Sequence, residues 1–368
     1  MKVRVGILTA PHIDYEKRGN TFVIRNVRIG IGFHWDRYEE QVFEGELEIL
    51  RKADGTETAV NIIDIEDYLT SVISSEISAD SPIELLKAHA VISRSWVASA
   101  IEQHNTGHIG YDVCGDDHCQ RYEGILRRNE RAQASVEATR GEVLVYGAGE
   151  EKTICDTRYH KCCGGKTENY ETCWEDKHIP YLSSVDCPYC AKAVGNERLL
   201  RMVLNNYDQE THDFHDWIVR YSQEEIQDII RQQSGIEFGE IVALRPLKRG
   251  VSGRIYSLEI IGTKHREVIG KELKIRQWLS RSCLYSSAFD CEETYSGENS
   301  DIASESRRIP GGFTLKGHGW GHGVGLCQIG AAVMADEGAT YTQILSHYYP
   351  GARLERFYRR GCTDFTLP

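Results

Sequence analysis

The order of strand-like and helix-like segments is the feature that most limits the fold of this chain. Short alternating apolar runs such as VRVGIL and VFEGELEIL fill the sequence from Val3 to about Ile63, and this pattern is typical of half-buried strands. Two helical patterns follow, IEDYLTSVISSE after a capping Asp64 and IELLKAHAVISRSWVASAIEQ after Pro82. Because strands and helices do not alternate regularly, we predict an α+β fold that begins with a small antiparallel sheet or barrel.

The rest of the chain carries shorter patterns. The predicted elements are a helix near 128–139, a strand at EVLVY, a helix at EEIQDIIRQQ, strands around VALRPL and RIYSLEIIG, a helix at GKELKIRQWLS and a last helix near 328–337. Residues 292–308 are polar and unpatterned, which predicts a mobile loop. The patterns divide the chain into a β segment (1–63), a core with the helix pair and Cys/His-rich loops (64–190), a variable α/β insertion (191–310) and a Gly/His-rich motif with a C-terminal helix (311–368).

Composition excludes some classes of protein. The net charge of -12 argues against binding to duplex nucleic acid, because that affinity comes mainly from Lys and Arg that neutralise phosphates. The sequence has no run of about 18 apolar residues that could cross a membrane. Its start, MKVRVGILTA, reads as a strand without the apolar core of a signal peptide. We therefore expect either a cytoplasmic protein or an export segment outside this sequence.

The helix pair offers a candidate site. Lys87 and Arg94 are seven residues apart on the second helix and share one face, while Leu85 and Ile92 share the opposite face. Glu76 lies just before the turn that joins the helices, where its carboxylate could point into a cleft. The alternative is a helical hairpin with an ordinary solvated face.

A second candidate is the run GHGWGHGVG at 317–325, with glycines at alternate positions. Phosphate binding is a poor interpretation, because the chain continues Gly-Leu-Cys-Gln where a phosphate loop needs Gly-Lys-Ser/Thr. A sugar-lining loop explains more: glycines admit a ring close to the backbone, Trp320 offers an apolar face, and His318, His322 and Gln328 can hydrogen-bond hydroxyls. The alternative is a structural turn whose glycines supply positive φ.

Cysteines and histidines suggest metal or disulfides, because ten of the twelve cysteines lie between Cys114 and Cys291. The stretch HIGYDVCGDDHCQRY holds His108, Cys114, His118 and Cys119, a composition that suits tetrahedral zinc. The alternative is a Cys114–Cys119 disulfide with surface histidines. A second group admits disulfides or another zinc site and consists of Cys155, Cys162, Cys163, Cys173, Cys187 and Cys190.

Three runs resemble the SpoIID/LytB family, related to stage II sporulation protein D. They are YLTSVISSEI...SPIELLKAHAVISRSW, CCGGKTENYETCW...PYLSSV and GHGWGHGVGLCQIGAAVMADEGATYTQILSHYYPG, in family order across most of the chain. By match to the family motifs, Glu76 falls on the catalytic acid, Lys87 and Arg94 on basic positions required for activity, and Tyr181 on a functionally important tyrosine. Trp96 departs from the pattern, since the family often carries a smaller aromatic there, and 191–310 is barely matched.

The resemblance implies a peptidoglycan lytic transglycosylase that acts on glycan strands without stem peptides, in a periplasmic or other extracytoplasmic location. It also implies a metal cluster like that of some family members, which favours structural zinc at His108, Cys114, His118 and Cys119 and no cofactor for catalysis. Related proteins recruit or activate a cell-wall amidase, so a non-catalytic glycan-binding partner is the rival interpretation.

The chemistry of a single carboxylate agrees with the implied activity. Cleavage of a glycosidic bond requires a proton on the leaving oxygen, and Glu76 can supply it. A hydrolase usually needs a second carboxylate, for which Asp80 and Glu84 are the nearby candidates. A lytic transglycosylase does not, because the muramoyl C6 hydroxyl is the internal nucleophile. In this interpretation Lys87 and Arg94 hold carboxylate or acetamido oxygens of the substrate.

Overall fold

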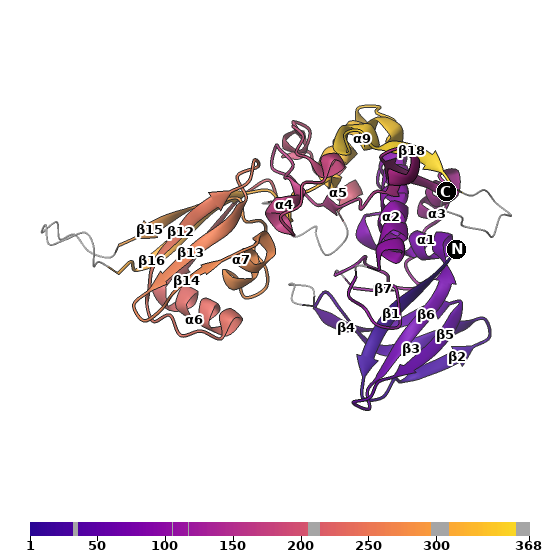
Figure 1. Cartoon of the computed structure of the whole chain (residues 1–368), viewed down its shortest axis with the longest axis horizontal. Helices are drawn as coiled ribbons and strands as arrows, with labels where there is room; N and C mark the ends of the chain where they lie inside the picture. Colours follow the sequence, from indigo (N-terminus) through magenta and orange to yellow (C-terminus); the bar gives the residue numbers. More distant parts are fainter. Residues whose placement is uncertain (32–35, 105, 117, 205–213, 296–308, 358–368) are drawn as a thin grey trace, which may run out of the picture. The chain divides into compact units, whose positions relative to one another are not determined.

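The computed structural model describes residues 1–31, 36–104, 106–116, 118–204, 214–295 and 309–357. The chain forms two compact units (Figure 1). Unit 1 comprises Met1–Arg158, Asn196–Glu210 and Ala331–Pro368, and unit 2 comprises Tyr159–Gly195 and Thr211–Gly330. Helices and several small sheets occur together in the described chain, which confirms the predicted α+β class.

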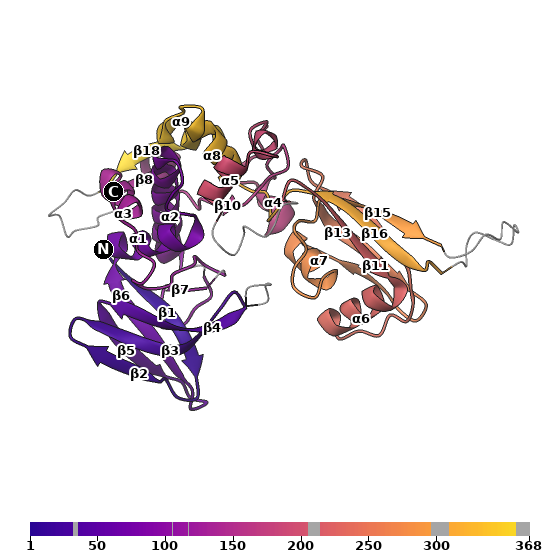
Figure 2. The ribbon, with the colours of Figure 1, turned by 180° about the vertical axis from the view of Figure 1, so that it is seen from behind.

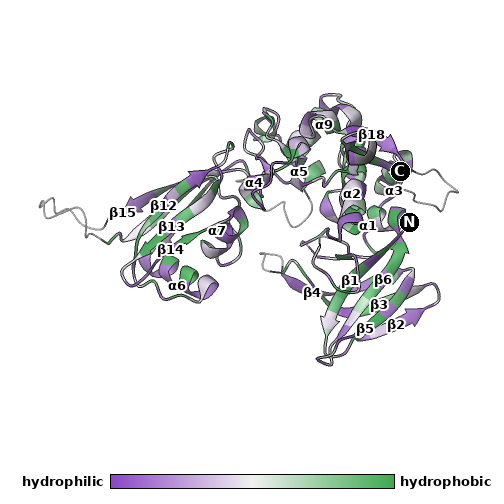
Figure 3. Ribbon diagram, in the orientation of Figure 1, coloured by the Kyte–Doolittle hydropathy of each residue, from purple (hydrophilic) through white to green (hydrophobic). Residues whose placement is uncertain are grey.

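Two small sheets begin unit 1. In the first, β1 (Lys2–Ala10) and β5 (Glu46–Arg51) flank β6 (Glu57–Asp64) antiparallel, and β7 (Val113–Cys114) runs parallel to the other edge of β1. In the second, β3 (Thr21–Ile29) lies between β2 (Tyr15–Arg18) and β4 (Arg37–Glu44). Alternation buries Val3 and Val5 of β1, and Figure 3 shows hydrophobic residues along β1, β3 and β6. The strands predicted as one sheet or barrel therefore form two sheets.

The helix pair has the predicted bounds. Helix α1 (Ile65–Glu76) begins where the Asp64 side chain accepts a hydrogen bond from the Glu66 backbone N–H at 3.0 Å. Helix α2 (Ile83–Gln103) follows Pro82 and is buried along most of its length, because it packs against α1, α3 (Glu130–Ala138) and β8 (Glu142–Tyr146). Helix α2 is therefore a core helix rather than an amphipathic surface helix.

Strands β8 and β9 (Thr153–Ile154) and helix α9 (Tyr341–Tyr348) of unit 1 also contact α2. Strand β8 lies between β9 and β18 (Arg353–Arg356). Unit 1 also contains the 3-10 helix η1 (Gly149–Glu151) and α5 (Glu197–Val203). Helix α9, which packs on α2, begins with a capping box between Thr340 and Gln343.

Unit 2 contains two three-stranded antiparallel sheets, shown in orange in Figure 2. One has the order β12 (Ile241–Arg249), β13 (Ile255–Gly262), β14 (Arg266–Ile269), and the other β11 (Asp216–Ser222), β16 (Gly312–His318), β15 (Phe289–Thr294). Helices α6 (Gln223–Ser234) and α7 (Glu272–Trp278) pack against the strands. Their shared core includes Ile226, Leu258, Ile260, Phe313 and Leu315.

Short elements connect the cysteine-rich segment of unit 2 to the glycine-rich motif. Strand β10 (Tyr159–His160) pairs parallel with β17 (Leu326–Cys327), which immediately precedes α8 (Gln328–Asp336). Between them in sequence lie α4 (Tyr170–Cys173) and the 3-10 helices η2 (Pro180–Leu182) and η3 (Cys190–Ala193). Most of the predicted loop at 292–308 lies outside the described residues. None of the described helices is long and apolar enough to cross a membrane.

Candidate functional site

Glu76 is the last residue of α1, and its side chain is half-buried. Its Oε1 accepts a hydrogen bond from the backbone N–H of Arg121 at 2.9 Å. The Arg121 guanidinium in turn donates to the carbonyl oxygen of Ser75 at 3.5 Å. The hydrogen bond from Arg121 therefore helps to fix the Glu76 carboxylate, which keeps partial access to solvent, as a proton donor to an external ligand requires.

The segment that fixes Glu76 is itself anchored to both helices. Gln120 is fully buried, and its Oε1 accepts a hydrogen bond from the Tyr68 hydroxyl of α1 at 3.0 Å. Its Nε2 donates to the carbonyl oxygen of Ser93 on α2 at 3.3 Å. Burial raises the pKa of Tyr68 well above its usual value, so this hydroxyl stays protonated as a donor. Sequence reasoning missed Gln120 and Arg121, although they directly follow Cys119.

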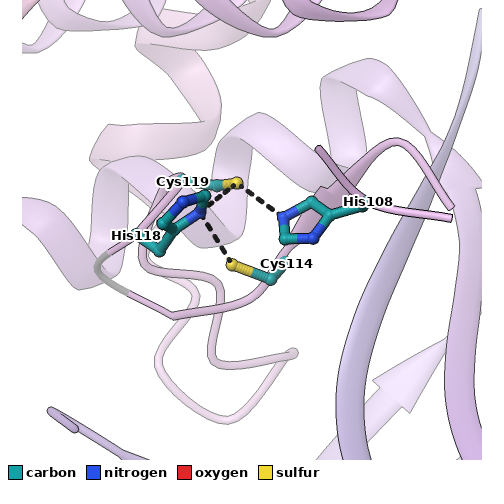
Figure 4. A group of neighbouring side chains, drawn as sticks. All are labelled: His108, Cys114, His118 and Cys119. Carbon is teal, nitrogen blue, oxygen red and sulfur yellow. Dashed lines mark hydrogen bonds between the residues drawn. The ribbon is translucent and has the colours of Figure 1, made fainter. Parts of the chain in front are cut away.

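Four side chains converge in the loop before Gln120, and we name them the His/Cys cluster: His108, Cys114, His118 and Cys119 (Figure 4). The Nε2 of His108 lies 3.3 Å from the Cys119 sulfur, and the Nδ1 of His118 lies 3.4 Å from the same sulfur and 3.9 Å from that of Cys114. All four donor atoms lie within 4.8 Å of one another. The structure thus brings together the residues that the sequence suggested.

Backbone pairing positions this cluster. Cys114 belongs to β7, opposite Gly6 of β1, and the Gly115 N–H donates to the Gly6 carbonyl oxygen at 2.9 Å. The Cys119 N–H donates to the Asp116 carbonyl oxygen at 3.0 Å, and this turn brings the Cys119 sulfur back towards the Cys114 sulfur. Both loop ends are fixed by the core of unit 1.

The donor set of the His/Cys cluster fits one tetrahedral zinc ion. Two imidazole nitrogens and two thiolate sulfurs are ligands that zinc prefers, and together they fill four positions. Hydrogen bonds from Cys119 and His118 lower the pKa of the Cys114 thiol, so a thiolate forms there readily. Cys114 and Cys119 are both free thiols in the structure.

Lys87 and Arg94 lie in different surroundings, although they share one side of α2. Lys87 is partly exposed and donates to Glu84 Oε1 at 2.7 Å. Arg94 is fully buried and forms a two-pronged ion pair with Glu66 of α1, with Nε–Oε1 at 3.1 Å and Nη2–Oε2 at 2.6 Å. Its guanidinium also donates to the carbonyl oxygen of Glu142 at 3.0 Å. In this structure Arg94 contacts protein groups, whereas Lys87 can reach a ligand.

The candidate sugar-lining residues belong to unit 2. Tyr181, Trp320 and Gln328 expose only 8, 9 and 3% of their surface. His318 and His322 are half-buried. The Nε2 of His318 lies 3.3 Å from the Ser252 carbonyl oxygen, and the Nδ1 of His322 accepts a hydrogen bond from the Val324 N–H at 3.0 Å.

A buried arginine explains part of the glycine pattern. Arg254 is fully buried, and its Nε donates to the Gly321 carbonyl oxygen at 3.1 Å. Gly323 has a φ of +84°, and a Cβ there would lie 2.5 Å from the Cζ of Arg254. This glycine is therefore required both by its backbone conformation and by a side chain of the protein itself. Lining a sugar site stays a prediction for this motif.

Comparison with known families gives two matches. Residues 53–146 match the model of the stage II sporulation protein family, and residues 168–325 match a domain family of unknown function. The first range holds Glu76, Lys87, Arg94 and the His/Cys cluster. The second holds the whole glycine-rich motif, residues 317–325.

Individual relatives extend over most of the chain. An uncharacterised protein of Brachyspira hyodysenteriae is 27% identical over 83% of this chain and 70% of its own length. Stage II sporulation protein D of Bacillus amyloliquefaciens is 26% identical over 80% of this chain and 74% of its own length. The amidase enhancer of Bacillus subtilis is 24% identical over 78% of this chain but only 40% of its own length. Together with the family model, these matches support membership of the stage II sporulation protein D family.

Proposed function

We propose that this protein is a peptidoglycan lytic transglycosylase. It cleaves the bond between N-acetylmuramic acid and N-acetylglucosamine in peptide-free glycan strands and leaves 1,6-anhydromuramoyl ends. Membership of the family and the similarity to an amidase enhancer support a cell-wall-related role. The observation that carries the proposal is the half-buried Glu76, fixed by the Arg121 N–H at the end of α1. An extracytoplasmic location is part of the same proposal.

In this mechanism Glu76 acts first as acid and then as base. Its carboxyl group donates a proton to the leaving glycosidic oxygen, and its carboxylate then accepts the proton of the muramoyl C6 hydroxyl as that hydroxyl attacks C1. The hydrogen bond from the Arg121 N–H to Oε1 holds the carboxyl group at the end of α1, where it exchanges the proton. A second carboxylate is unnecessary, because no water attacks.

The two basic residues receive different roles. Lys87 is placed to bind a carboxylate or acetamido oxygen of the substrate, because its ammonium group is partly exposed and needs only to leave Glu84. Arg94 acts as a positioning residue, because its contacts with Glu66 and Glu142 join α1, which carries Glu76, to α2 and β8. In unit 2, His318 and His322 are the partly exposed candidates for contact with sugar hydroxyls.

The His/Cys cluster would hold a structural zinc ion. With four protein ligands no position is open for an activated water, so the ion stabilises a fold and supplies no step of the reaction. The ligand Cys119 directly precedes Gln120 and Arg121, and both residues make the hydrogen bonds that fix Tyr68 and Glu76. Zinc would thus act on catalysis only by ordering this segment.

Digestion of peptide-free glycan strands, with products read by mass spectrometry, tests the proposal. We expect anhydromuramoyl ends from the wild type and none from Glu76→Gln, which retains the shape but cannot exchange the proton. Asp80→Asn is the matched control, because Asp80 is an exposed carboxylate four residues away. Reducing ends that disappear in Asp80→Asn would instead establish hydrolysis with two carboxylates.

The similarity to an amidase enhancer favours one rival function, a non-catalytic glycan-binding partner that activates a cell-wall amidase. This role predicts that the purified protein cleaves no strands but raises the rate of an amidase on intact peptidoglycan. It also predicts the same activation by wild type and Glu76→Gln. Activation that is lost in Glu76→Gln would contradict a purely non-catalytic role.

A further inference from the structure

A second group of metal-ligand side chains lies in unit 2, and we name it the four-cysteine cluster: Cys163, Cys187, Cys190 and Cys327. The four sulfurs lie within 4.8 Å of one another, and all four residues are fully buried. We propose that these residues bind one structural zinc ion. The proposed site is independent of the enzymatic activity proposed above.

The spacing of the sulfurs favours a shared ion over disulfides. Zinc–sulfur bonds of about 2.3 Å in a tetrahedron place the sulfurs roughly 3.8 Å apart, and the sulfurs of Cys163 and Cys190 lie 3.5 Å apart. A disulfide would draw one pair to about 2.05 Å and separate it from the other sulfurs. In the structure none of the four cysteines forms a disulfide, and their sulfurs are gathered around one point.

The local sequence and backbone are suited to thiolates. Cys187 and Cys190 form a Cys-Pro-Tyr-Cys turn, the two-residue spacing of many zinc sites. The N–H of Gly165 donates to the Cys163 sulfur at 3.4 Å, and the N–H groups of Cys163 and Gly330 donate to the Cys327 sulfur at 3.3 Å each. Amide hydrogen bonds of this kind orient thiolate ligands and stabilise their charge.

A buried cation lies beside the site. Four thiolates and one zinc ion carry a net charge of -2, which is unfavourable in a buried position without compensation. The Arg254 guanidinium is fully buried and donates to the carbonyl oxygens of Cys163 at 3.2 Å and Cys162 at 3.5 Å. Its positive charge is therefore placed against the loop that supplies one ligand.

The ligand set also indicates the metal and its role. Sulfur-only tetrahedral sites select zinc or iron, and clusters of several irons hold their cysteine sulfurs farther apart than a single ion does. The four protein ligands and the burial of all four sulfurs leave no position for a substrate or water, which makes the ion structural. It would join Cys163 to Cys327, which are 164 residues apart, and so fasten β17 and α8 to the loop after β10.

Metal analysis of the full chain tests the site. Cys187→Ser/Cys190→Ser should contain about one equivalent of zinc less than the wild type, because the site loses half of its ligands. The matched control is Cys173→Ser, which replaces a buried cysteine of the same unit outside the cluster and should retain the wild-type zinc content. A His108→Ala/Cys119→Ala variant distinguishes the two clusters, since its loss should add to that of the cysteine pair.

Three results would overturn the proposal. The first is an equal zinc content in the cysteine-pair variant and the Cys173→Ser control, and the second is one equivalent of iron in place of zinc. The third is a disulfide within the four-cysteine cluster, which would lower the mass of the non-reduced protein by two hydrogens for each bond. If the variant does not fold, alkylation of the native wild type replaces it. A strong chelator should then expose Cys163, Cys187, Cys190 and Cys327 to the reagent well before Cys173. Simultaneous alkylation of all five cysteines would show that burial alone protects them, and would also reject the site.

Discussion

Replacing Arg94 by Ala distinguishes a structural from a catalytic role for this residue. Arg94 is fully buried, and its guanidinium pairs with both carboxylate oxygens of Glu66, which is itself only 2% exposed. The same guanidinium donates to the carbonyl oxygens of Val136 at the end of α3 and of Glu142 at the start of β8. The substitution would therefore leave a buried carboxylate without its cationic partner, and the carbonyl oxygens of Val136 and Glu142 would each lose a hydrogen bond.

The expected loss of stability is large. Removal of one partner of a buried ion pair costs about 3–5 kcal/mol, because the remaining charge stays desolvated. Lys87→Ala on the same helix is the control and should cost less than about 1 kcal/mol, since the pair of Lys87 with Glu84 is partly exposed. Adding Glu66→Gln to Arg94→Ala should recover part of the loss, because it removes the unpaired charge.

Hydrogen exchange is the suitable assay, because a chain with two compact units need not unfold in one step. Amides of α1 and α2 should exchange much faster in Arg94→Ala than in Lys87→Ala, while those of α6 and β13 should not change. Strand cleavage should fall only in proportion to the fraction of molecules that keep α1 and α2 ordered. A fully stable Arg94→Ala protein without activity would refute this reasoning and make Arg94 a catalytic residue.

Three further perturbations test the two units. Gly323→Ala should destabilise unit 2 by at least about 1 kcal/mol more than Gly253→Ala. Both glycines have a φ of +84°, but only a Cβ at Gly323 would contact Arg254 within 3 Å. Equal unfolding midpoints of the two variants in urea would contradict this clash. Glu168→Gln should cost about 2 kcal/mol or more, because this buried carboxylate accepts hydrogen bonds from two backbone N–H groups and a hydroxyl of the 251–252 segment; retention of the wild-type midpoint would contradict this. Mild chelation should release zinc from the half-exposed His/Cys cluster before it releases zinc from the buried four-cysteine cluster. Deuterium uptake at 108–121 should then rise before strand cleavage falls. Loss of cleavage without a rise in uptake would give the ion a direct part in catalysis.

Helices α1 and α2 could be predicted because residues at their starts carry clear sequence signals. Asp64 and Pro82 mark the starts of α1 and α2, and the predicted bounds agree with the structure. Strands β11 and β16 were missed, because their pairing joins segments about a hundred residues apart and the end of β16 is rich in glycine. Local patterns do not report such long-range pairing, and the division of the N-terminal strands into two sheets was hidden for the same reason.

The candidate sites show the same contrast. The His/Cys cluster could be predicted because its four residues lie within twelve positions of the sequence. The four-cysteine cluster could not, since Cys327 stood in a motif interpreted through its glycines and only the β10–β17 pairing brings it to Cys163. Helical spacing correctly placed Lys87 and Arg94 on one side of α2. It could not show that α3 and β8 cover this side of the helix at Arg94.

Most of the glycine-rich motif serves the fold, and only a few of its side chains are exposed enough to contact a ligand. Gly323 yields space to Arg254, whose guanidinium also bonds the Ser252 hydroxyl at 3.0 Å, and that hydroxyl donates to the buried Glu168 at 2.6 Å. A bare backbone is thus needed to enclose a charged network within unit 2, even without any ligand. Contact with a sugar would then depend on the half-buried rings of His318 and His322, because the Arg254 guanidinium is already hydrogen-bonded to the Gly321 carbonyl oxygen of the motif. Replacing these two histidines should therefore weaken glycan binding while leaving the Arg254 network intact, whereas changes at the glycines act first on the fold.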